Sequence, residues 1–191
     1  MQLLTERLFL IPLQPDGMRT LIARTTDPEL IDAYNEMLTL SLQHPERWLW
    51  YTAWGMYQND SGDFVGDLCF KGLPENGQPE IGYGVLKECE GQGYATEAAA
   101  AVRDYWFGTV GAPWLAGFHA SQNVASSRVL AKTGFHYDHD TVLHRFDGTE
   151  VPCLAWYLLN PGSQKSDEPA AAAPAVQAEP TEPAENAETT V

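Results

Sequence analysis

Two glycines, Gly91 and Gly93, directly precede a run of strong helix formers in the segment EGQGYATEAAAA, residues 90–101. Glycine allows backbone dihedrals and close approaches that a side chain would obstruct. The helix expected behind them presents unpaired N–H groups and the positive end of its dipole. A glycine turn that runs into a helix N-terminus is typical of phosphate-binding sites. The segment therefore predicts a ligand that carries phosphate.

Two other phosphate-binding turns do not fit this segment. A P-loop closes with Gly-Lys-Ser/Thr, whereas Gly93 is followed here by Tyr94. A dinucleotide fingerprint needs a third glycine three residues after Gly93, where this chain has Thr96, and an acidic residue about 20 positions further on. No Asp or Glu occurs between Asp104 and Asp138. Both classes of nucleotide site are therefore disfavoured.

A third kind of turn fits better. Residues 88–98 (ECEGQGYATEA) resemble the pyrophosphate turn of the GNAT superfamily of N-acetyltransferases, [Q/R]-x-x-G-x-[G/A], with a departure at Glu88. Residues 123–135 are similar to a second pattern of that family, which begins with Asn and Ser three residues apart and ends in Gly-Phe. The opening TERLFL at 5–10 resembles the RimJ/RimL-like branch of ribosomal-protein alanine N-acetyltransferases. The resemblance covers about residues 3–160.

The resemblance implies an enzyme that moves an acetyl group from acetyl-CoA, as co-substrate, to a primary amine by direct attack, without a metal. A CoA-binding sensor or interaction module that lacks turnover is the alternative. In the family, the backbone of the strand before the glycine turn helps to stabilise the oxyanion. The residues implied to bind acetyl-CoA are Tyr83, Val85, Gly91, Gln92, Gly93, Tyr94, Ala95, Thr96 and Asn123.

Three residues are candidate catalytic groups. Many family members place a tyrosine seven residues after the asparagine as general acid, but this chain has Leu130 there. The resemblance then implies that Ser126 hydrogen-bonds the departing thiolate; the alternative is a surface serine that bonds backbone. Glu80 is the candidate base or amine-orienting carboxylate, directly or through water, unless it is only an exposed acid at a strand end. Asn123 caps the helix that follows it and, in the family, also contacts the cofactor or the reacting centre.

The order of hydrophobic patterns predicts an α/β fold, with one GNAT-like mixed central sheet flanked by helices. Residues 52–86 lack the crossover helices that parallel strand pairs need, which excludes a plain doubly wound fold. The first strand is expected to end in a Pro-Asp-Gly turn at 15–17. Strands are expected at 8–13, 52–58, 64–71, 80–86, 114–120, 136–144 and 151–159, and helices at 18–24, 28–40, 45–50, 95–107 and 124–133.

We expect a single acetyltransferase domain over residues 1–160 and a disordered acidic tail over 161–191. The chain has 191 residues, of which 44% are hydrophobic, so one domain of ordinary size can form a core. Residues 163–191 contain no Leu, Ile, Phe, Tyr, Trp or Met. Such a segment cannot bury enough apolar surface to offset its chain entropy.

Charge and cysteine content indicate the kind of partner and the compartment. The formal net charge of −15 disfavours nucleic acid and suits a cationic acceptor, either a small-molecule amine or a protein N-terminal amine. Three cysteines without a CxxC pair indicate a reduced, cytoplasmic protein. The chain shows neither a signal peptide nor a run of about 18 apolar residues, so no membrane association is expected. Oligomeric state is not readable from the sequence.

The histidines do not suggest a metal site. His136 and His139 lie three residues apart on an expected strand. Side chains alternate along a strand, so these two are expected on opposite faces. The expected metal content is therefore none.

Overall fold

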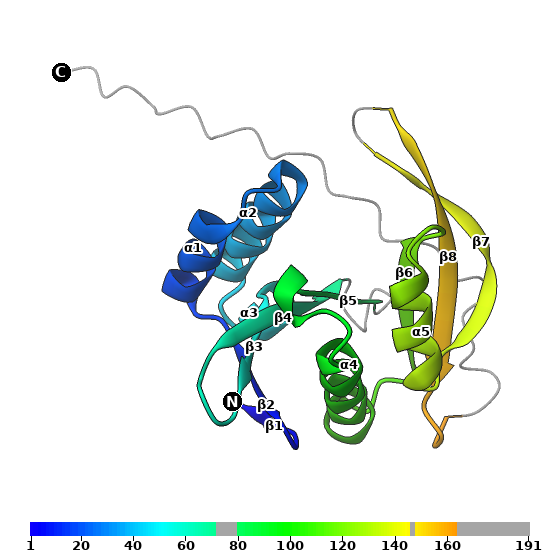
Figure 1. The fold of residues 1–191 in the computed structure, drawn as a ribbon, viewed down its shortest axis with the longest axis horizontal. Helices are drawn as coiled ribbons and strands as arrows, with labels where there is room; N and C mark the ends of the chain where they lie inside the picture. Colours follow the sequence, from blue (N-terminus) through cyan, green and yellow to red (C-terminus); the bar gives the residue numbers. More distant parts are fainter. Residues whose placement is uncertain (72–79, 146–147, 164–191) are drawn as a thin grey trace.

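The computed structural model describes residues 1–71, 80–145 and 148–163. The connection between the strands expected at 64–71 and 80–86, and the expected tail from 164 onward, lie outside these residues. The elements, in chain order, are β1 (Leu3–Leu4), β2 (Leu8–Pro12), α1 (Pro15–Arg24), α2 (Pro28–Gln43), α3 (Trp48–Tyr51), β3 (Trp54–Gln58), β4 (Phe64–Lys71), β5 (Glu80–Val85), α4 (Tyr94–Tyr105), β6 (Trp114–Ala120), α5 (Val124–Lys132), β7 (His136–His144) and β8 (Glu150–Leu159) (Figure 1).

The strands form one mixed sheet, as the sequence predicted. Their order, which the sequence did not predict, is β1-β2-β3-β4-β5-β6-β8-β7. The pairings are antiparallel except for β5 with β6, which is parallel. Among the described residues that parallel ladder contains the pairs Glu80–Ala116 and Ile81–Gly117. The remaining residues of β5, 82–85, pair with β4 alone. The sheet therefore divides into two arms beyond Ile81, β1–β5 and β6–β8 (Figure 1).

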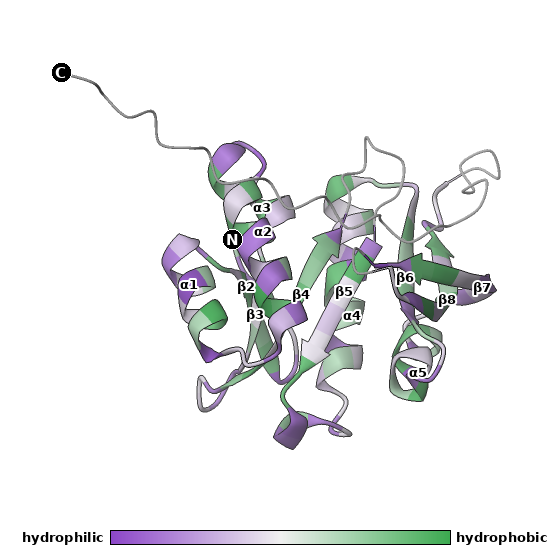
Figure 2. Cartoon of the chain, turned by 90° about the horizontal axis from the view of Figure 1, so that it is seen from above, coloured by the Kyte–Doolittle hydropathy of each residue, from purple (hydrophilic) through white to green (hydrophobic). Residues whose placement is uncertain are grey.

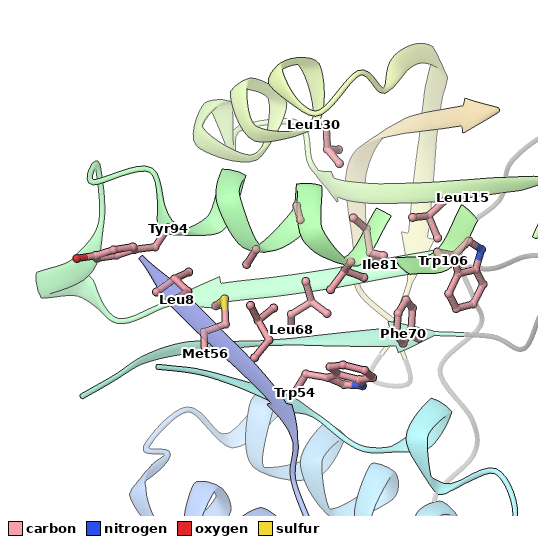
Figure 3. Close-up of a cluster of buried hydrophobic side chains, with 14 of the residues drawn as sticks. Leu8, Trp54, Met56, Leu68, Phe70, Ile81, Tyr94, Trp106, Leu115 and Leu130 are labelled. Atoms are coloured by element: carbon pink, nitrogen blue, oxygen red, sulfur yellow. The ribbon is translucent and has the colours of Figure 1, made fainter. Parts of the chain in front are cut away.

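Helices cover both faces of the first arm. Helix α4 packs on β1, β2, β4 and β5, and the buried cluster between them includes Leu8, Met56, Leu68 and Ile81 (Figure 3). Ala98 and Ala99 of α4 are fully buried, so these small side chains let the helix approach the sheet closely. The opposite face holds a second cluster, formed by Leu13, Met18, Leu21, Tyr34 and Ala53. Figure 3 shows α4 and the α1–α2 pair on opposite sides of the strands.

Local signals explain where the first two helices begin. Helix α2 begins as predicted, with the Asp27 side chain accepting from the Glu29 N–H and Pro28 in the first helical position. The turn expected at 15–17 is wrong, because these residues form the first turn of α1. Pro15 suits the first position of a helix, and Asp16 forms an ion pair with Arg19.

Other expectations also need correction. The helix expected at 45–50 is only the short segment α3, and β1 was not expected. A bulge at Asp138 shifts the register of β7, so that His136 pairs with Tyr157 and His139 with Ala155. Because these two partners are two residues apart on β8, they lie on the same face, and so do both histidines, rather than on opposite faces as expected. Within the described residues no group of three or more His, Cys, Asp or Glu side chains could hold a metal ion. Nor is any described helix long and apolar enough to cross a membrane.

Candidate active site

The separation of β5 from β6 creates a stretch of strand whose backbone is free on one side. We call residues 82–85 of β5, with the facing part of β6 and the start of α5, the β5–β6 opening. In Figure 2 this half of β5 is pale, because it consists largely of glycine and tyrosine. Gly66 of β4 supports it from the other side, since a Cβ at Gly66 would lie 2.2 Å from the Gly84 carbonyl oxygen. Only glycine therefore permits β4 to approach this part of β5.

The glycine turn leads from the opening to α4. Gly91 (φ +72°) and Gly93 (φ +86°) both adopt left-handed backbone conformations that favour glycine. Gly93 is the N-cap of α4, and no side chain caps it. The first backbone hydrogen bond of the helix runs from the Glu97 N–H to the Gly93 carbonyl, 3.0 Å. The preceding N–H groups of Tyr94, Ala95 and Thr96 have no acceptor within the helix and are suited to bind an anion.

An ion pair from the start of the chain holds this turn in place. Glu97 accepts hydrogen bonds from the Thr5 hydroxyl (2.6 Å), the Arg7 backbone N–H (2.8 Å) and the Arg7 Nε (2.7 Å). Arg7 Nη1 donates to the Gln92 carbonyl, 2.9 Å, and its guanidinium lies 4.7 Å from the Tyr94 ring centre. Burial would raise the pKa of Glu97, but the hydrogen bonds from Thr5 and Arg7 outweigh it and lower that pKa. Glu97 thus has a structural role.

Several predicted cofactor residues can contribute only backbone. The Tyr94 side chain is 7% exposed, belongs to the buried cluster of Figure 3 and accepts a hydrogen bond from Gln58 Nε2, 2.6 Å. The Gln92 side chain donates to the Glu88 carbonyl, 3.0 Å. Gly91, Gln92 and Gly93 are all exposed. The turn therefore presents its backbone, rather than side chains, to a ligand.

The N-terminus of α5 lies across the opening from β5. Asn123 Oδ1 accepts from the Ser126 N–H, 3.1 Å, so the capping role predicted for Asn123 is present. The Tyr83 hydroxyl donates to the Ser126 carbonyl, 3.3 Å, and burial raises the pKa of Tyr83 to about 12. The structure therefore brings Tyr83, Asn123 and Ser126 together. Sequence reasoning used only the backbone of Tyr83 and missed its hydroxyl.

His119 fixes the start of α5 on the sheet. Its Nε2 lies 3.0 Å from the Trp156 indole nitrogen and 3.2 Å from Ser127 Oγ, and its Nδ1 lies 2.8 Å from the Ala120 carbonyl oxygen. An indole N–H can only donate, so Nε2 accepts and the hydrogen is placed on Nδ1. His119 is buried, and this network orders the turn of α5 that contains Ser126.

Glu80 is not an exposed acid at a strand end. It is 3% exposed, and its Oε1 lies 3.0 Å from Lys71 Nζ on the neighbouring strand. The Lys71 side chain is half exposed, and the charge of Glu80 raises the pKa of Lys71. The candidate base is therefore present beside the opening, but covered and paired.

Comparisons with known proteins concern the family and the fold. The family model described as the acetyltransferase (GNAT) domain matches residues 7–136. The N-acetyltransferase YoaA of Bacillus subtilis is 31% identical over 112 residues, which are 56% of this chain and 62% of YoaA, so the match spans less than two thirds of that relative.

Solved structures share the fold. A GNAT acetyltransferase of Bacillus anthracis has a TM-score of 0.67 at 17% identity, over 84% of this chain and 99% of its own. The ribosomal-protein-S5-alanine acetyltransferase of Vibrio fischeri has a TM-score of 0.69 at 12% identity, over 86% and 99%. A variant of the spermidine N-acetyltransferase SpeG of Vibrio cholerae has a TM-score of 0.66 at 15% identity, over 82% and 95%. At these identities the likeness concerns the fold alone.

Proposed function

Because the chain belongs to the GNAT family of acetyltransferases, we propose that it transfers an acetyl group from acetyl-CoA to a primary amine. The family is one of N-acetyltransferases, and its chemistry is acyl transfer from a CoA thioester to nitrogen. For this chain we propose that acetyl-CoA is the acyl donor and that a primary amine is the acceptor.

The observation that supports it most is the continuity between the β5–β6 opening and the glycine turn. The free backbone of residues 82–85 leads directly to a helix N-terminus with unpaired N–H groups. In the part of the chain that the structure describes, no neighbouring group lies within 4 Å of the positions that a Cβ would take at Gly84 and Gly91, so both ends leave room for a ligand. An extended ligand with a phosphate at one end fits this path.

We assign binding of the CoA pyrophosphate to the backbone of Gly91, Gln92 and Gly93 and to the N–H groups of Tyr94, Ala95 and Thr96. Tyr83 and Val85 would bind along the strand, where backbone N–H groups would also stabilise a developing oxyanion. Acetyl-CoA supplies an activated carbonyl carbon and a thiolate leaving group. Asn123 holds the start of α5 in place beside this path.

The catalytic assignment concerns two proton transfers and the exchange of bonds between them. An ammonium acceptor first loses a proton; its nitrogen then bonds to the acetyl carbon as the carbon–sulfur bond breaks. The thiolate finally takes up the second proton lost from that nitrogen. We propose that Ser126 hydrogen-bonds the thiolate, and that Glu80 accepts the first proton through water, because it is buried and paired with Lys71.

Thiol release from acetyl-CoA tests this function directly. The protein is mixed with acetyl-CoA and with spermidine, phenethylamine or a short peptide that has a free N-terminus, and free thiol is measured. We expect amine-dependent thiol release with at least one of these acceptors. Tight binding of CoA without thiol release from any of them would contradict the proposal and favour a CoA-binding module without turnover.

A further inference from the structure

We propose that Asp67 of β4, held by Tyr34 of α2, binds the ammonium group of the acceptor amine beside Gly84. This inference rests on the proposed function and names the residue that recognises the acceptor. It concerns the face of the sheet that α2 covers, opposite to α4.

The register of the sheet places Asp67 next to open space. Asp67 lies directly opposite Gly84 on β5 and opposite Gly55 on β3. Directly opposite residues share a face of the sheet, with Cβ positions about 5 Å apart. At Gly55 the Tyr57 ring fills the place of a Cβ, whereas at Gly84 no neighbouring side chain or backbone of the described residues lies within 4 Å of that place. The space beside Asp67 is therefore filled on the β3 side and, as far as the described residues show, open on the β5 side.

Tyr34 fixes the carboxylate and leaves one of its oxygens available. The Tyr34 hydroxyl donates to Asp67 Oδ2, 2.8 Å. Among the described residues Oδ1 has no hydrogen-bond partner, and no cation pairs with Asp67. Tyr34 is 7% exposed, and burial followed by the charge of Asp67 raises its pKa, so it stays a donor. A half-buried carboxylate without a counter-ion is a strong site for an ammonium group.

Asp67 is more exposed than Glu80, the acid of β5 on the same face. At Gly82 a Cβ would lie 3.1 Å from Cys69 Sγ and 3.3 Å from Lys71 Cε, so these side chains cover that part of β5. Lys71 in turn neutralises Glu80. Going along β5 toward the glycine turn, the face is covered at Glu80 and Gly82 and opens at Gly84. An amine placed there meets the backbone of residues 82–85, where we place the thioester.

The charge of Asp67 makes acceptor binding depend on pH. Burial raises its pKa to about 6, although the hydrogen bond from Tyr34 opposes the shift. Other titratable groups described on this face are Tyr34, Tyr57, Cys69, Lys71 and Glu80. Burial raises the pKa of Tyr57, and it raises the pKa of Cys69 to about 11. Since the carboxylate is the form that binds an ammonium, binding is present above pH 6 and is lost as the pH falls through 6. A simple alkyl amine stays protonated throughout this range.

The test measures KM for the best acceptor of the thiol-release panel between pH 5 and pH 8. Asp67→Asn keeps an oxygen to accept from Tyr34 but removes the charge; we expect KM for the amine to rise about 10- to 100-fold, with KM for acetyl-CoA unchanged. In the wild type KM for the amine should rise below pH 6, and in Asp67→Asn it should not change with pH.

Tyr34→Phe removes the hydrogen bond that lowers the pKa of Asp67, so the rise in KM should begin at a higher pH than in the wild type. Asp63→Asn, an equal charge change at an exposed position before β4, is the control and should match the wild type.

The outcomes separate this inference from the proposed function. Thiol release by the wild type together with an unchanged, equally pH-dependent KM in Asp67→Asn would overturn the inference alone. An equal rise of KM in Asp63→Asn would also overturn it, because the effect would then come from net charge. No thiol release with any amine would overturn the proposed function and this inference with it.

Discussion

The hydroxyl of Tyr83 on β5 reaches across the β5–β6 opening and donates a hydrogen bond to the Ser126 carbonyl of α5. With a pKa of about 12, Tyr83 stays protonated at neutral pH. Two hydroxyl groups, those of Tyr83 and Ser126, thus belong to residues in contact at the start of α5. The single hydrogen of the Tyr83 hydroxyl is donated to the Ser126 carbonyl, so the Ser126 hydroxyl is the donor that we assign to the departing thiolate.

Ser126→Ala tests the role of the serine hydroxyl. A group that helps only as the thiolate departs acts in the transition state, so kcat should fall about 10- to 100-fold while KM for acetyl-CoA changes little. Steady-state kinetics at saturating amine would measure both. Ser127→Ala is the matched control. It loses the contact with His119, so we expect a lower melting temperature and little change in kcat. Equal kcat in the wild type and Ser126→Ala would rule out this role.

Some residues of the candidate site could be predicted from the sequence and others could not. Asn123 and Gly93 could be predicted, because a cap and a left-handed turn leave local signals in residue type. Asp67 could not be predicted, because its proposed role depends on two residues that pair with it on other strands. These are Gly84, which has open space beside it, and Gly55, where the Tyr57 ring fills the space. The pairing of Glu80 with Lys71 likewise depends on strand register, which the sequence did not supply.

At the scale of elements, the β5–turn–α4 unit carries the proposed donor site. β5 loses its parallel partner after Ile81, and the chain then needs two left-handed glycines to enter α4. The Arg7–Glu97 pair fixes the turn from outside, by binding both the Gln92 carbonyl and the first turn of α4. The backbone N–H groups are therefore held in position before a ligand arrives, which reduces the entropy lost on binding.

Gly91→Val tests this unit against a matched glycine elsewhere. Gly91 (φ +72°) and Gly62 (φ +74°), in the β3–β4 turn, have nearly equal φ angles and no atom within 4 Å of a Cβ. Either valine variant should lose about 1–2 kcal/mol of unfolding free energy, because a side chain disfavours positive φ. Only Gly91→Val should lose CoA affinity, measured by calorimetry on the folded protein. Equal CoA affinity in the two variants would contradict the turn's assigned role.

Element boundaries were predictable where capping signals agreed with periodicity and failed where two interpretations competed. At α2 both signals agreed, and the start at Pro28 is as expected. At α1 the Pro-Asp-Gly sequence suits a turn as well as a first helical turn, and packing of Met18 and Leu21 on the sheet favours the helix. The bulge at Asp138 has no local signal, so the faces of His136 and His139 were predicted wrongly.

At the scale of the whole molecule, the fold creates one gap in an otherwise continuous sheet and places both proposed substrate sites at it. The mixed sheet and the family were predictable from the sequence, because two ordered motifs and the strand pattern agree with them. The strand order was not, because the insertion of β8 between β6 and β7 is decided by long-range pairing. The donor side faces the glycine turn, and Asp67 lies on the α2 side, so donor and acceptor would approach the gap from different directions.

Hydrogen–deuterium exchange with and without CoA tests the central claim, that the β5–β6 opening and the glycine turn together bind the acyl donor. Saturating CoA should slow amide exchange in two separate segments, residues 82–85 and 91–96, and leave the β3–β4 turn around Gly62 unchanged. Both segments should respond in the same titration, because one extended ligand covers them. Slowed exchange in only one of them, or only at sites elsewhere in the protein when calorimetry shows CoA bound, would contradict the account.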